Sequence, residues 1–284
     1  MIKLDAASLR QLLSKVAAAP SLRAHAKTYV EKPVCTRTGS TDKNIQLHRS
    51  VLNELGYDLD SRFTILDFGC GDGKRVCQYR AAGFNAFGVD IKLDTRNDFL
   101  RLIPTDKQYR IPFDDRTFDF VYSEQVLEHV QDYPAALSEV ARVLKPDGFS
   151  LHIFPSKYRL LEPHVFVPLG GIIREYPWLL FWAWLGIRNS FQKGLKYKDA
   201  ADLNYDYLKT ATCYLSAKKI RNYLLVHFRN ITLAERYFIK HSYGRARHVY
   251  PFVRVLPFIP ALYGLLHTRV LFFSKDTFGS DSVR

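Results

Sequence analysis

The chain has 284 residues, of which 47% are hydrophobic and 24% charged, and its formal net charge at pH 7 is +13. This composition excludes disorder as the main state and is sufficient for one elaborated domain or two small ones. The excess of basic residues attracts the phosphates of nucleic acid, anionic lipid headgroups or acidic small substrates, and charge alone does not choose among these partners.

The cysteines and the first residues predict the compartment. The four cysteines form no C-x-x-C pair, and they are too few for a disulfide scaffold, which favours a reducing compartment. The opening sequence MIKLDAASLR lacks the basic stretch and the uninterrupted apolar run of a signal peptide. We therefore expect a cytoplasmic protein, with peripheral attachment to a membrane as an open alternative.

Two helical segments precede the first predicted strand. Residues 1–42 are polar and mixed with some Ala-rich helical character, and we interpret them as a helical arm or cap, or equally as a frayed terminus. Residues 44–55 carry apolar side chains close to helical spacing and are followed by Gly56, a common stop signal. These residues are predicted to form a helix.

The stretch TILDFGCGDG at residues 64–73 is the strongest local signal. Residues 64–68 are apolar and partly β-branched, which predicts a buried strand, and glycines follow at positions 69, 71 and 73. Glycine permits positive φ and leaves no Cβ in the way, so backbone N–H groups and the start of a helix at residues 72–82 can face a bound group.

Spacing weakens two phosphate-binding interpretations of this loop. A dinucleotide fingerprint needs glycine where Lys74 or Val76 stands, and a phosphate loop needs Ser or Thr where Arg75 stands. What remains is a D-x-G-x-G-x-G loop that begins at Asp67. A second predicted strand at residues 85–89 ends in Asp90, at the place where a doubly wound fold positions a carboxylate for ribose hydroxyls.

Strands and helices alternate beyond this point. We expect a helix around residues 96–103, a strand at 118–122, a helix at 133–144 and a strand at 149–154, followed after a break by a helix at 217–228 and strands at 231–239 and 268–273. Such alternation predicts a parallel sheet with helices on both faces and a ligand at the carboxyl ends of the strands.

Three further motifs accompany the loop and Asp90: IPFDDRTFDFV at residues 111–121, VLEHV at 126–130 and EVARVLKPDGF at 139–149. With these motifs in order, the chain resembles the class I S-adenosylmethionine-dependent methyltransferases of the type 11-like group over residues 43–156. The resemblance implies an α/β, doubly wound Rossmann-like sheet of seven strands, mostly parallel with an antiparallel last strand. Residues 43–156 would form the cofactor-binding core, and residues 216–284 would complete it around a basic, aromatic insertion.

The resemblance also implies which residues surround S-adenosyl-L-methionine. The loop would enclose the methionine portion, Asp90 the ribose and Asp106 the adenine, and the end of the strand at 118–122 would face the methionine portion. The full expected set is Asp67, Gly69, Cys70, Gly71, Gly73, Asp90, Ile91, Asp106, Ser123 and Glu124. The competing interpretations are capping or solvated carboxylates, glycines needed only for packing, and a helix-capping serine.

Two histidines are the candidate catalytic residues. Methyl transfer is an in-line displacement that needs a base only when the acceptor must lose a proton. His129 in VLEHV matches a family position that is often near the reaction centre, although a structural role is the competing interpretation. His164 follows Glu162 and Pro163 after the fifth strand, where acceptor-binding loops emerge, and it is either a base or a surface residue of a turn. No metal site is expected, because the histidines and cysteines show no ligand spacing.

Residues 157–215 interrupt the alternation and contain all three tryptophans. The apolar run at residues 176–187 is too short to span a membrane, so we interpret this segment as a lid over an apolar acceptor pocket or as a surface that enters the lipid interface. Basic and aromatic residues interleave at residues 236–254, which suits an anionic membrane surface and also single-stranded nucleic acid.

The sequence therefore predicts a methyltransferase that modifies a small-molecule or lipid-linked acceptor, at oxygen rather than at carbon or nitrogen. Nucleic acid is the less favoured partner, because no RNA-binding module is recognisable. The alternatives are an RNA methyltransferase and a non-catalytic, membrane-associated protein that retains the fold.

Overall fold

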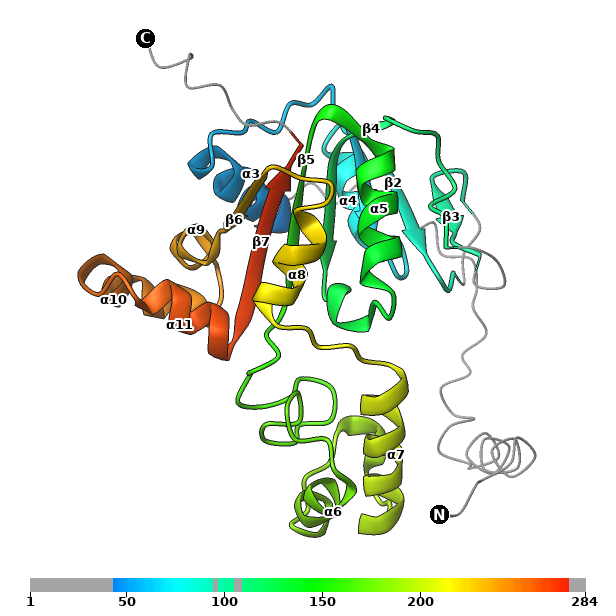
Figure 1. Ribbon diagram of the computed structural model, residues 1–284, viewed down its shortest axis with the longest axis vertical. Helices are drawn as coiled ribbons and strands as arrows, with labels where there is room; N and C mark the ends of the chain where they lie inside the picture. Colours follow the sequence, from blue (N-terminus) through cyan, green and yellow to red (C-terminus); the bar gives the residue numbers. More distant parts are fainter. Residues whose placement is uncertain (1–42, 94–96, 105–108, 276–284) are drawn as a thin grey trace. The chain divides into compact units, whose positions relative to one another are not determined.

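The computed structural model describes residues 43–93, 97–104 and 109–275 (Figure 1). The predicted N-terminal arm at residues 1–42 and the predicted adenine contact Asp106 lie outside these residues. The described residues belong to one compact unit, and the finer division at residues 156 and 215 stays a prediction.

A seven-stranded sheet with strand order β3-β2-β1-β4-β5-β7-β6 forms the centre of the described chain. The first five strands are parallel where they pair, and β7 is antiparallel to both of its neighbours. This arrangement confirms the predicted fold class. The strands are β1 (Thr64–Phe68), β2 (Asn85–Asp90), β3 (Leu100–Leu102), β4 (Phe118–Glu124), β5 (Leu144–Pro155), β6 (Asn230–Leu233) and β7 (Thr268–Ser274).

Helices cover both faces of the sheet, because successive strand residues point to opposite faces and both sets are apolar. Ile65 belongs to the core beneath α3, α4 and α9, whereas Leu66 belongs to the core beneath α5 and α8. Figure 1 shows α5 and α8 together on one face. The helices of the core are α3 (Lys43–Glu54), α4 (Lys74–Ala81), η1 (Leu127–His129), α5 (Tyr133–Val143), α8 (Ala217–Leu224), α9 (Glu235–His241), η3 (Arg245–Val249), α10 (Tyr250–Val255) and α11 (Ile259–Leu266).

Two predicted elements are wrong, and tertiary contacts explain both. The helix expected around residues 96–103 is replaced by the edge strand β3, because β2 holds this segment through hydrogen bonds from Gly88 N to Phe99 O (2.8 Å) and from Ile103 N to Asp90 O (2.8 Å). The strand expected at residues 231–239 ends at Leu233, where α9 begins two residues later and buries Ile239. The helix α8 also ends four residues before its predicted end.

The segment at residues 157–215, here called the insertion, has a small core of its own. Its helices α6 (Tyr176–Trp184) and α7 (Tyr197–Thr210) pack together, with η2 (Ser190–Gln192) between them in the chain. Trp178 and Trp182 pack on Leu179 and Leu208, and the Trp178 indole N–H donates to Pro168 O (2.8 Å). None of the helices in the described part of the chain is long and apolar enough to cross a membrane.

His152 is a fully buried polar group in the central strand β5. Its ring nitrogens hydrogen-bond the hydroxyls of Ser123 (2.7 Å) and Ser150 (2.8 Å), and its ring stacks on Phe273. Burial lowers the pKa of His152 from 6.5 to about 3. The imidazole is therefore neutral in the folded protein at all but strongly acidic pH.

We expect His152 to make folding sensitive to acid. Because its pKa is lower in the folded than in the unfolded chain, the unfolded chain binds the proton first, and stability present above pH 6.5 is lost as the pH falls toward 3. Between pH 6.5 and 5 the loss amounts to about 2 kcal/mol at about 1.4 kcal/mol per pH unit. Urea unfolding at pH 7.5 and 5.0 should show that His152→Gln loses less stability than the wild type by about this amount. Equal losses would contradict the assignment.

Candidate active site

The three glycines after β1 all adopt positive φ, at 83° for Gly69, 53° for Gly71 and 73° for Gly73. A Cβ atom at Gly69 would lie 2.4 Å from the Val126 side chain, and one at Gly73 would lie 2.5 Å from Leu100. A Cβ atom at Gly71 would have no described atom within 4 Å. Packing therefore explains Gly69 and Gly73, whereas Gly71 presents its backbone to open space, as a ligand-binding turn requires.

The carboxylate of Asp90 is fixed at this loop. It accepts hydrogen bonds from Gly71 N (2.8 Å) and Lys92 N (3.0 Å), one on each oxygen. A carboxylate oxygen can accept more than one hydrogen bond, so Asp90 keeps capacity for the hydroxyls of a ribose. Ile91 is exposed beside it, whereas Cys70 is buried and its thiol pKa is raised by burial. Cys70 can thus contribute only packing and its backbone to this site.

A buried charge network lies around the end of β1. Burial raises the pKa of Asp67 to about 7, although the nearby Arg75 opposes this shift. Burial also acts to raise the pKa of Glu124, but hydrogen bonds from His48 (2.9 Å) and Arg75 hold it below its ordinary value. Glu124 is therefore ionised and paired. The sequence analysis missed His48 and Arg75, and the signal for His48 was its place on the apolar stripe of the predicted helix.

Ser123 does not present its side chain to this site. Its hydroxyl is buried and bonded to His152 within the sheet, so only the Ser123 backbone lies at the carboxyl end of β4. Of the predicted cofactor residues, Asp67, Gly71 and Asp90 thus lie together at the loop, while the side chain of Ser123 is part of the core.

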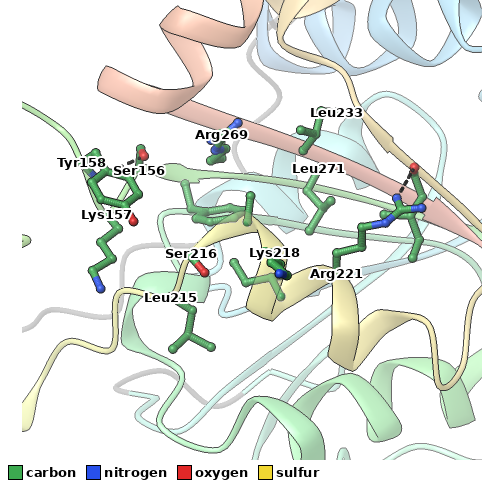
Figure 2. Close-up of a pocket in the computed structure, with 14 residues that line it drawn as sticks. Ser156, Lys157, Tyr158, Leu215, Ser216, Lys218, Arg221, Leu233, Arg269 and Leu271 are labelled. Carbon is green, nitrogen blue, oxygen red and sulfur yellow. Dashed lines mark hydrogen bonds between the residues drawn. The ribbon is translucent and has the colours of Figure 1, made fainter.

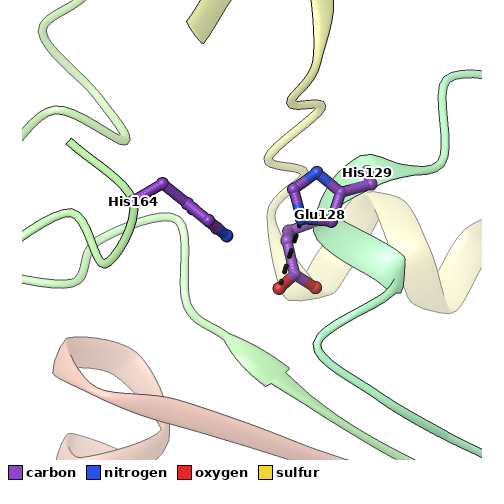
Figure 3. A group of neighbouring side chains, drawn as sticks. All are labelled: Glu128, His129 and His164. Carbon is purple, nitrogen blue, oxygen red and sulfur yellow. Dashed lines mark ion pairs between the residues drawn. The ribbon is translucent and has the colours of Figure 1, made fainter. Parts of the chain in front are cut away.

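A second cluster, here called the Glu-His-His cluster, consists of Glu128, His129 and His164. These residues each offer a ligand or proton-binding atom, and the three atoms lie within 4.8 Å of one another (Figure 3). Glu128 and His129 belong to η1 after β4, and His164 belongs to the insertion after β5. The sequence analysis selected both histidines but missed Glu128, although it stands next to His129 in the VLEHV motif.

Both imidazoles of the cluster are held through their Nδ1 atoms. His164 Nδ1 bonds Glu162 Oε1 (2.8 Å), and the buried Glu162 also accepts a hydrogen bond from Tyr214 (2.7 Å). His129 Nδ1 bonds the carbonyl oxygen of Ala211 (2.7 Å). Since a carbonyl oxygen only accepts, the Nδ1 of neutral His129 carries the proton and its Nε2 has a free lone pair. Both rings can therefore offer Nε2 to a common partner.

Glu128 is buried without a conventional partner. The residue is 1% exposed, and neither carboxylate oxygen has a hydrogen-bond partner within the residues described. The nearest ion-pair contact is 3.9 Å, from Glu128 Oε1 to His129 Nε2. Burial raises the pKa of Glu128 to about 7 and lowers that of His129. A buried carboxyl group without a hydrogen-bond partner lowers the stability of the fold. Such groups occur at functional sites more often than in structural cores.

The backbone next to the cluster is strained. Gln125 (φ 57°), Phe166 (φ 59°) and Leu169 (φ 55°) are three of the four non-glycine residues with positive φ in the part of the chain that the structure describes. Gln125 lies two residues before η1, and the other two residues follow His164 in a short loop. Strained residues of this type persist where surrounding structure holds them, and they are frequent at binding sites.

The cluster and the cofactor loop are in direct contact through Val126. This residue packs on Gly69 of the loop and precedes Glu128 by two positions. The turn is also tied to the sheet, because Gln125 N donates to Ile153 O (2.8 Å). The two sites are thus neighbours on one rigid support at the carboxyl ends of β1 and β4.

A separate cavity of about 210 Å³ lies beside the start of α8 (Figure 2). Its walls are mainly apolar, and four of its lining residues are basic: Lys157, Lys218, Arg221 and Arg269. Among the described residues that line it, none belongs to the predicted cofactor set or to the Glu-His-His cluster.

Residues 42–206 match the sequence model of a family described as a methyltransferase domain. The chain belongs to this family. A similar protein is an uncharacterized methyltransferase of Schizosaccharomyces pombe, which is 34% identical over an alignment of 138 residues, with coverage of 38% of this chain and 49% of the relative. A putative 23S rRNA (guanine-N(1)-)-methyltransferase of Bacillus subtilis is 33% identical over 125 residues, 40% of this chain and 42% of the relative. The chain thus spans about half or less of the length of these relatives.

Among solved structures, an S-adenosylmethionine-dependent methyltransferase from Mesorhizobium loti is similar, with 12% identity, a TM-score of 0.44, and coverage of 84% of this chain and 99% of the other. The family match over residues 42–206 agrees with the methyltransferase domain, and with the cofactor S-adenosylmethionine, that the sequence motifs predict. The residues present fit this cofactor, since the open backbone at Gly71 and the adjacent Asp90 carboxylate suit a ribose-bearing ligand.

We expect Asp90→Ala to weaken binding of S-adenosylmethionine by about 10-fold or more, because it removes charged hydrogen-bond acceptors worth about 1.5–3 kcal/mol. It also frees the loop N–H of Gly71. Isothermal titration calorimetry of the folded variant measures the change. Asp60→Ala, which removes a surface carboxylate paired with Arg62, is the matched control. Wild-type affinity in Asp90→Ala would exclude Asp90 as the ribose ligand.

Proposed function

We propose that the protein transfers the methyl group of S-adenosylmethionine to a hydroxyl oxygen of a small-molecule or lipid-linked acceptor. The observation that carries this proposal is the Glu-His-His cluster, which adjoins the cofactor loop through the contact of Val126 with Gly69. A hydroxyl has to lose its proton for efficient methylation, and an imidazole and carboxylate cluster beside the donor is suited to that task. An acceptor that is already nucleophilic would need only positioning.

In this proposal His164 and His129 are the catalytic residues that receive the acceptor hydroxyl. Their Nδ1 bonds to Glu162 and to Ala211 O fix the two rings in orientation. Tyr207 lies beside both rings, with centroids 5.5 Å from His164 and 6.5 Å from His129. An acceptor at the two Nε2 atoms would thus lie against an aromatic wall.

Two exposed apolar surfaces support a lipophilic acceptor. On the insertion, Trp184 is 64% exposed and lies beside the exposed Phe181, whereas Trp178 and Trp182 pack in the interior of the insertion. The packing of Trp178 and Trp182 supports the interpretation as a folded lid, whereas the exposure of Trp184 supports the interpretation as a lipid-facing surface. On α10 and its flanks the large apolar side chains of Phe252, Val255 and Phe258 are exposed among basic residues of the same segment, which are Arg245, Arg247 and Arg254.

The cavity beside α8 also fits a lipid-linked acceptor, because it combines an apolar interior with basic residues at Lys157, Lys218 and Arg221. An apolar tail can occupy such a cavity while an anionic group binds the cations. The net charge of +13 further favours an anionic membrane surface as the place where the acceptor is encountered.

RNA is the second candidate acceptor. It is favoured by the same net charge and by the similarity to a protein that is named as a putative rRNA methyltransferase. Incubation with labelled S-adenosylmethionine and fractionated cell extract separates the candidates, since label enters lipid, small metabolites or RNA. We expect label in the lipid or small-metabolite fraction, in a form stable to conditions that cleave esters. Label in RNA alone would overturn the proposed acceptor class.

We expect His164→Ala to bind S-adenosylmethionine as the wild type does and to lose turnover by at least about 100-fold, the contribution of a group that assists proton removal. Calorimetry measures binding, and label transfer in the acceptor fraction identified above measures turnover. His227→Ala, which removes a loop imidazole after α8, is the control and should keep full activity. Full activity of His164→Ala would remove His164 from the catalytic step.

We expect the exposed aromatic face of α6 to bind anionic membranes. The double substitution Phe181→Ala and Trp184→Ala should weaken binding to phosphatidylserine-containing liposomes, measured by sedimentation, by at least about 10-fold, since each side chain contributes up to about 1.5–3 kcal/mol when it is fully buried. Binding should also weaken with added salt. Val226→Ala removes an exposed apolar side chain outside this face and serves as the control. If the double variant sediments with liposomes as the wild type does, the exposed aromatic face of α6 does not bind membranes.

A further inference from the structure

We propose that Glu128, His129 and His164 bind one divalent transition-metal ion, and that the acceptor hydroxyl binds to this ion. The chemical role rests on the proposed function, but binding of the ion does not. The expectation that the chain has no metal site came from linear ligand spacing alone. The fold brings together residues that stand 35 positions apart in the sequence, between His129 and His164.

The three candidate ligand atoms are close enough to share an ion. They lie within 4.8 Å of one another, and Figure 3 shows the His164 ring directed toward Glu128 and His129. Tetrahedral ligands bound at about 2.1 Å lie about 3.4 Å apart, so the side chains have to close by about 1.4 Å at most. The two histidine side chains are 34% and 25% exposed, which leaves them room for this movement.

The outer contacts of the histidines follow the pattern of metal-binding imidazoles. A metal-bound histidine commonly donates its second ring N–H to a carboxylate or a backbone carbonyl, which fixes the tautomer and the ring plane. His164 makes this contact with Glu162, and His129 makes it with Ala211 O. Glu162 is itself held by Tyr214 and by the backbone N–H groups of His164 and Val165. Both Nε2 atoms remain available to an ion.

Glu128 supplies the independent observation. Its carboxylate is buried, it faces the two imidazoles, and both of its oxygens lack a hydrogen-bond partner in the described chain. A bound cation would provide the missing partner, because a buried carboxylate is stabilised by coordination to a metal. A structural carboxyl group without this role would have no need of the two oriented imidazoles beside it.

The ligand set indicates the class of ion. Two imidazole nitrogens and one carboxylate suit Zn²⁺, Co²⁺ or Mn²⁺, whereas Mg²⁺ and Ca²⁺ prefer sites built from oxygen atoms. Three protein ligands leave a coordination position for the acceptor. With both Nε2 atoms bound to the ion, the imidazoles would assist proton removal through the ion and would not take the proton themselves. The metal-bound hydroxyl would release its proton to water, its oxygen would attack the methyl carbon, and the carbon–sulfur bond would break with its electron pair left on sulfur as S-adenosylhomocysteine.

Direct metal titration tests the site without any acceptor. After removal of metals with a chelator, the full-length protein should bind one Zn²⁺ or Co²⁺ per chain by calorimetry, and Co²⁺ should give visible absorption bands of a nitrogen- and oxygen-ligated ion. Excess Mg²⁺ should not compete. Absence of stoichiometric Zn²⁺ and Co²⁺ binding to the wild type would overturn the proposal.

Variants locate the ion. Glu128→Gln and His164→Ala should each weaken binding by about 10-fold or more, as loss of a ligand does at such sites. His241→Ala removes an imidazole that is paired with Glu54 on another surface, and it should bind as the wild type does. If the melting curve of Glu128→Gln or His164→Ala shows loss of the fold, His129→Gln is measured in its place, because it alters a partly exposed side chain. Wild-type affinity in all folded cluster variants would place the ion elsewhere and refute the proposal.

Activity separates this proposal from the proposed function. If the chelated enzyme methylates its acceptor at the full rate, the metal proposal fails while hydroxyl methylation stands. If the ion binds at the cluster but methyl groups enter only nitrogen or carbon atoms, the proposed function fails while the metal site stands. Recovery of a chelated, inactive enzyme by Zn²⁺, Co²⁺ or Mn²⁺ but not by Mg²⁺ supports both.

Discussion

The missing side chain at Gly69 is the constraint that brings the two halves of the site together. Gly69 adopts φ 83°, and any Cβ atom there would lie 2.4 Å from Val126. The loop after β1 and the turn after β4 can therefore pack this closely only around glycine. Gly71, which holds Asp90, and Gln125, which precedes η1, extend this contact to both sites. Under the proposed function, this backbone packing would fix the distance between a methyl donor at the loop and an acceptor at the Glu-His-His cluster.

Burial shapes the charges around this contact in two different ways. Glu124 is compensated by His48 and Arg75, so it remains ionised despite its depth. Glu128 has no such compensation, and its pKa rises to about 7. Glu124 is thus paired within the protein, whereas Glu128 lacks a partner that a ligand could supply. Under the proposed function, Glu128 lies on the acceptor side of the site, where a bound ligand would supply the partner that its carboxylate lacks.

Local sequence was sufficient wherever structure depends on neighbouring residues. The glycine loop, Asp90 and most strands are contiguous motifs, and the parallel sheet follows from the alternation of strands and helices. β3 and α9 escaped prediction because tertiary contacts decide their form: β3 pairs with β2, and α9 packs against α3 and β7. Such contacts have no local signal. The partners of His164 and His129, which are Glu162 with Tyr214 and Ala211, depend on the path of the insertion. Glu128 was overlooked because a single buried carboxylate becomes conspicuous only when its surroundings are known.

The Glu-His-His cluster is divided between two parts of the chain. Glu128 and His129 come from the core, His164 comes from the insertion, and the returning chain is clasped to η1 by the bond from Cys213 N to Glu128 O (2.6 Å). Under the proposed function, an insertion that is exchanged between family members would carry His164 together with the surface that contacts the acceptor. Reactivity and acceptor selectivity would then change together, while the residues that bind the cofactor stay the same.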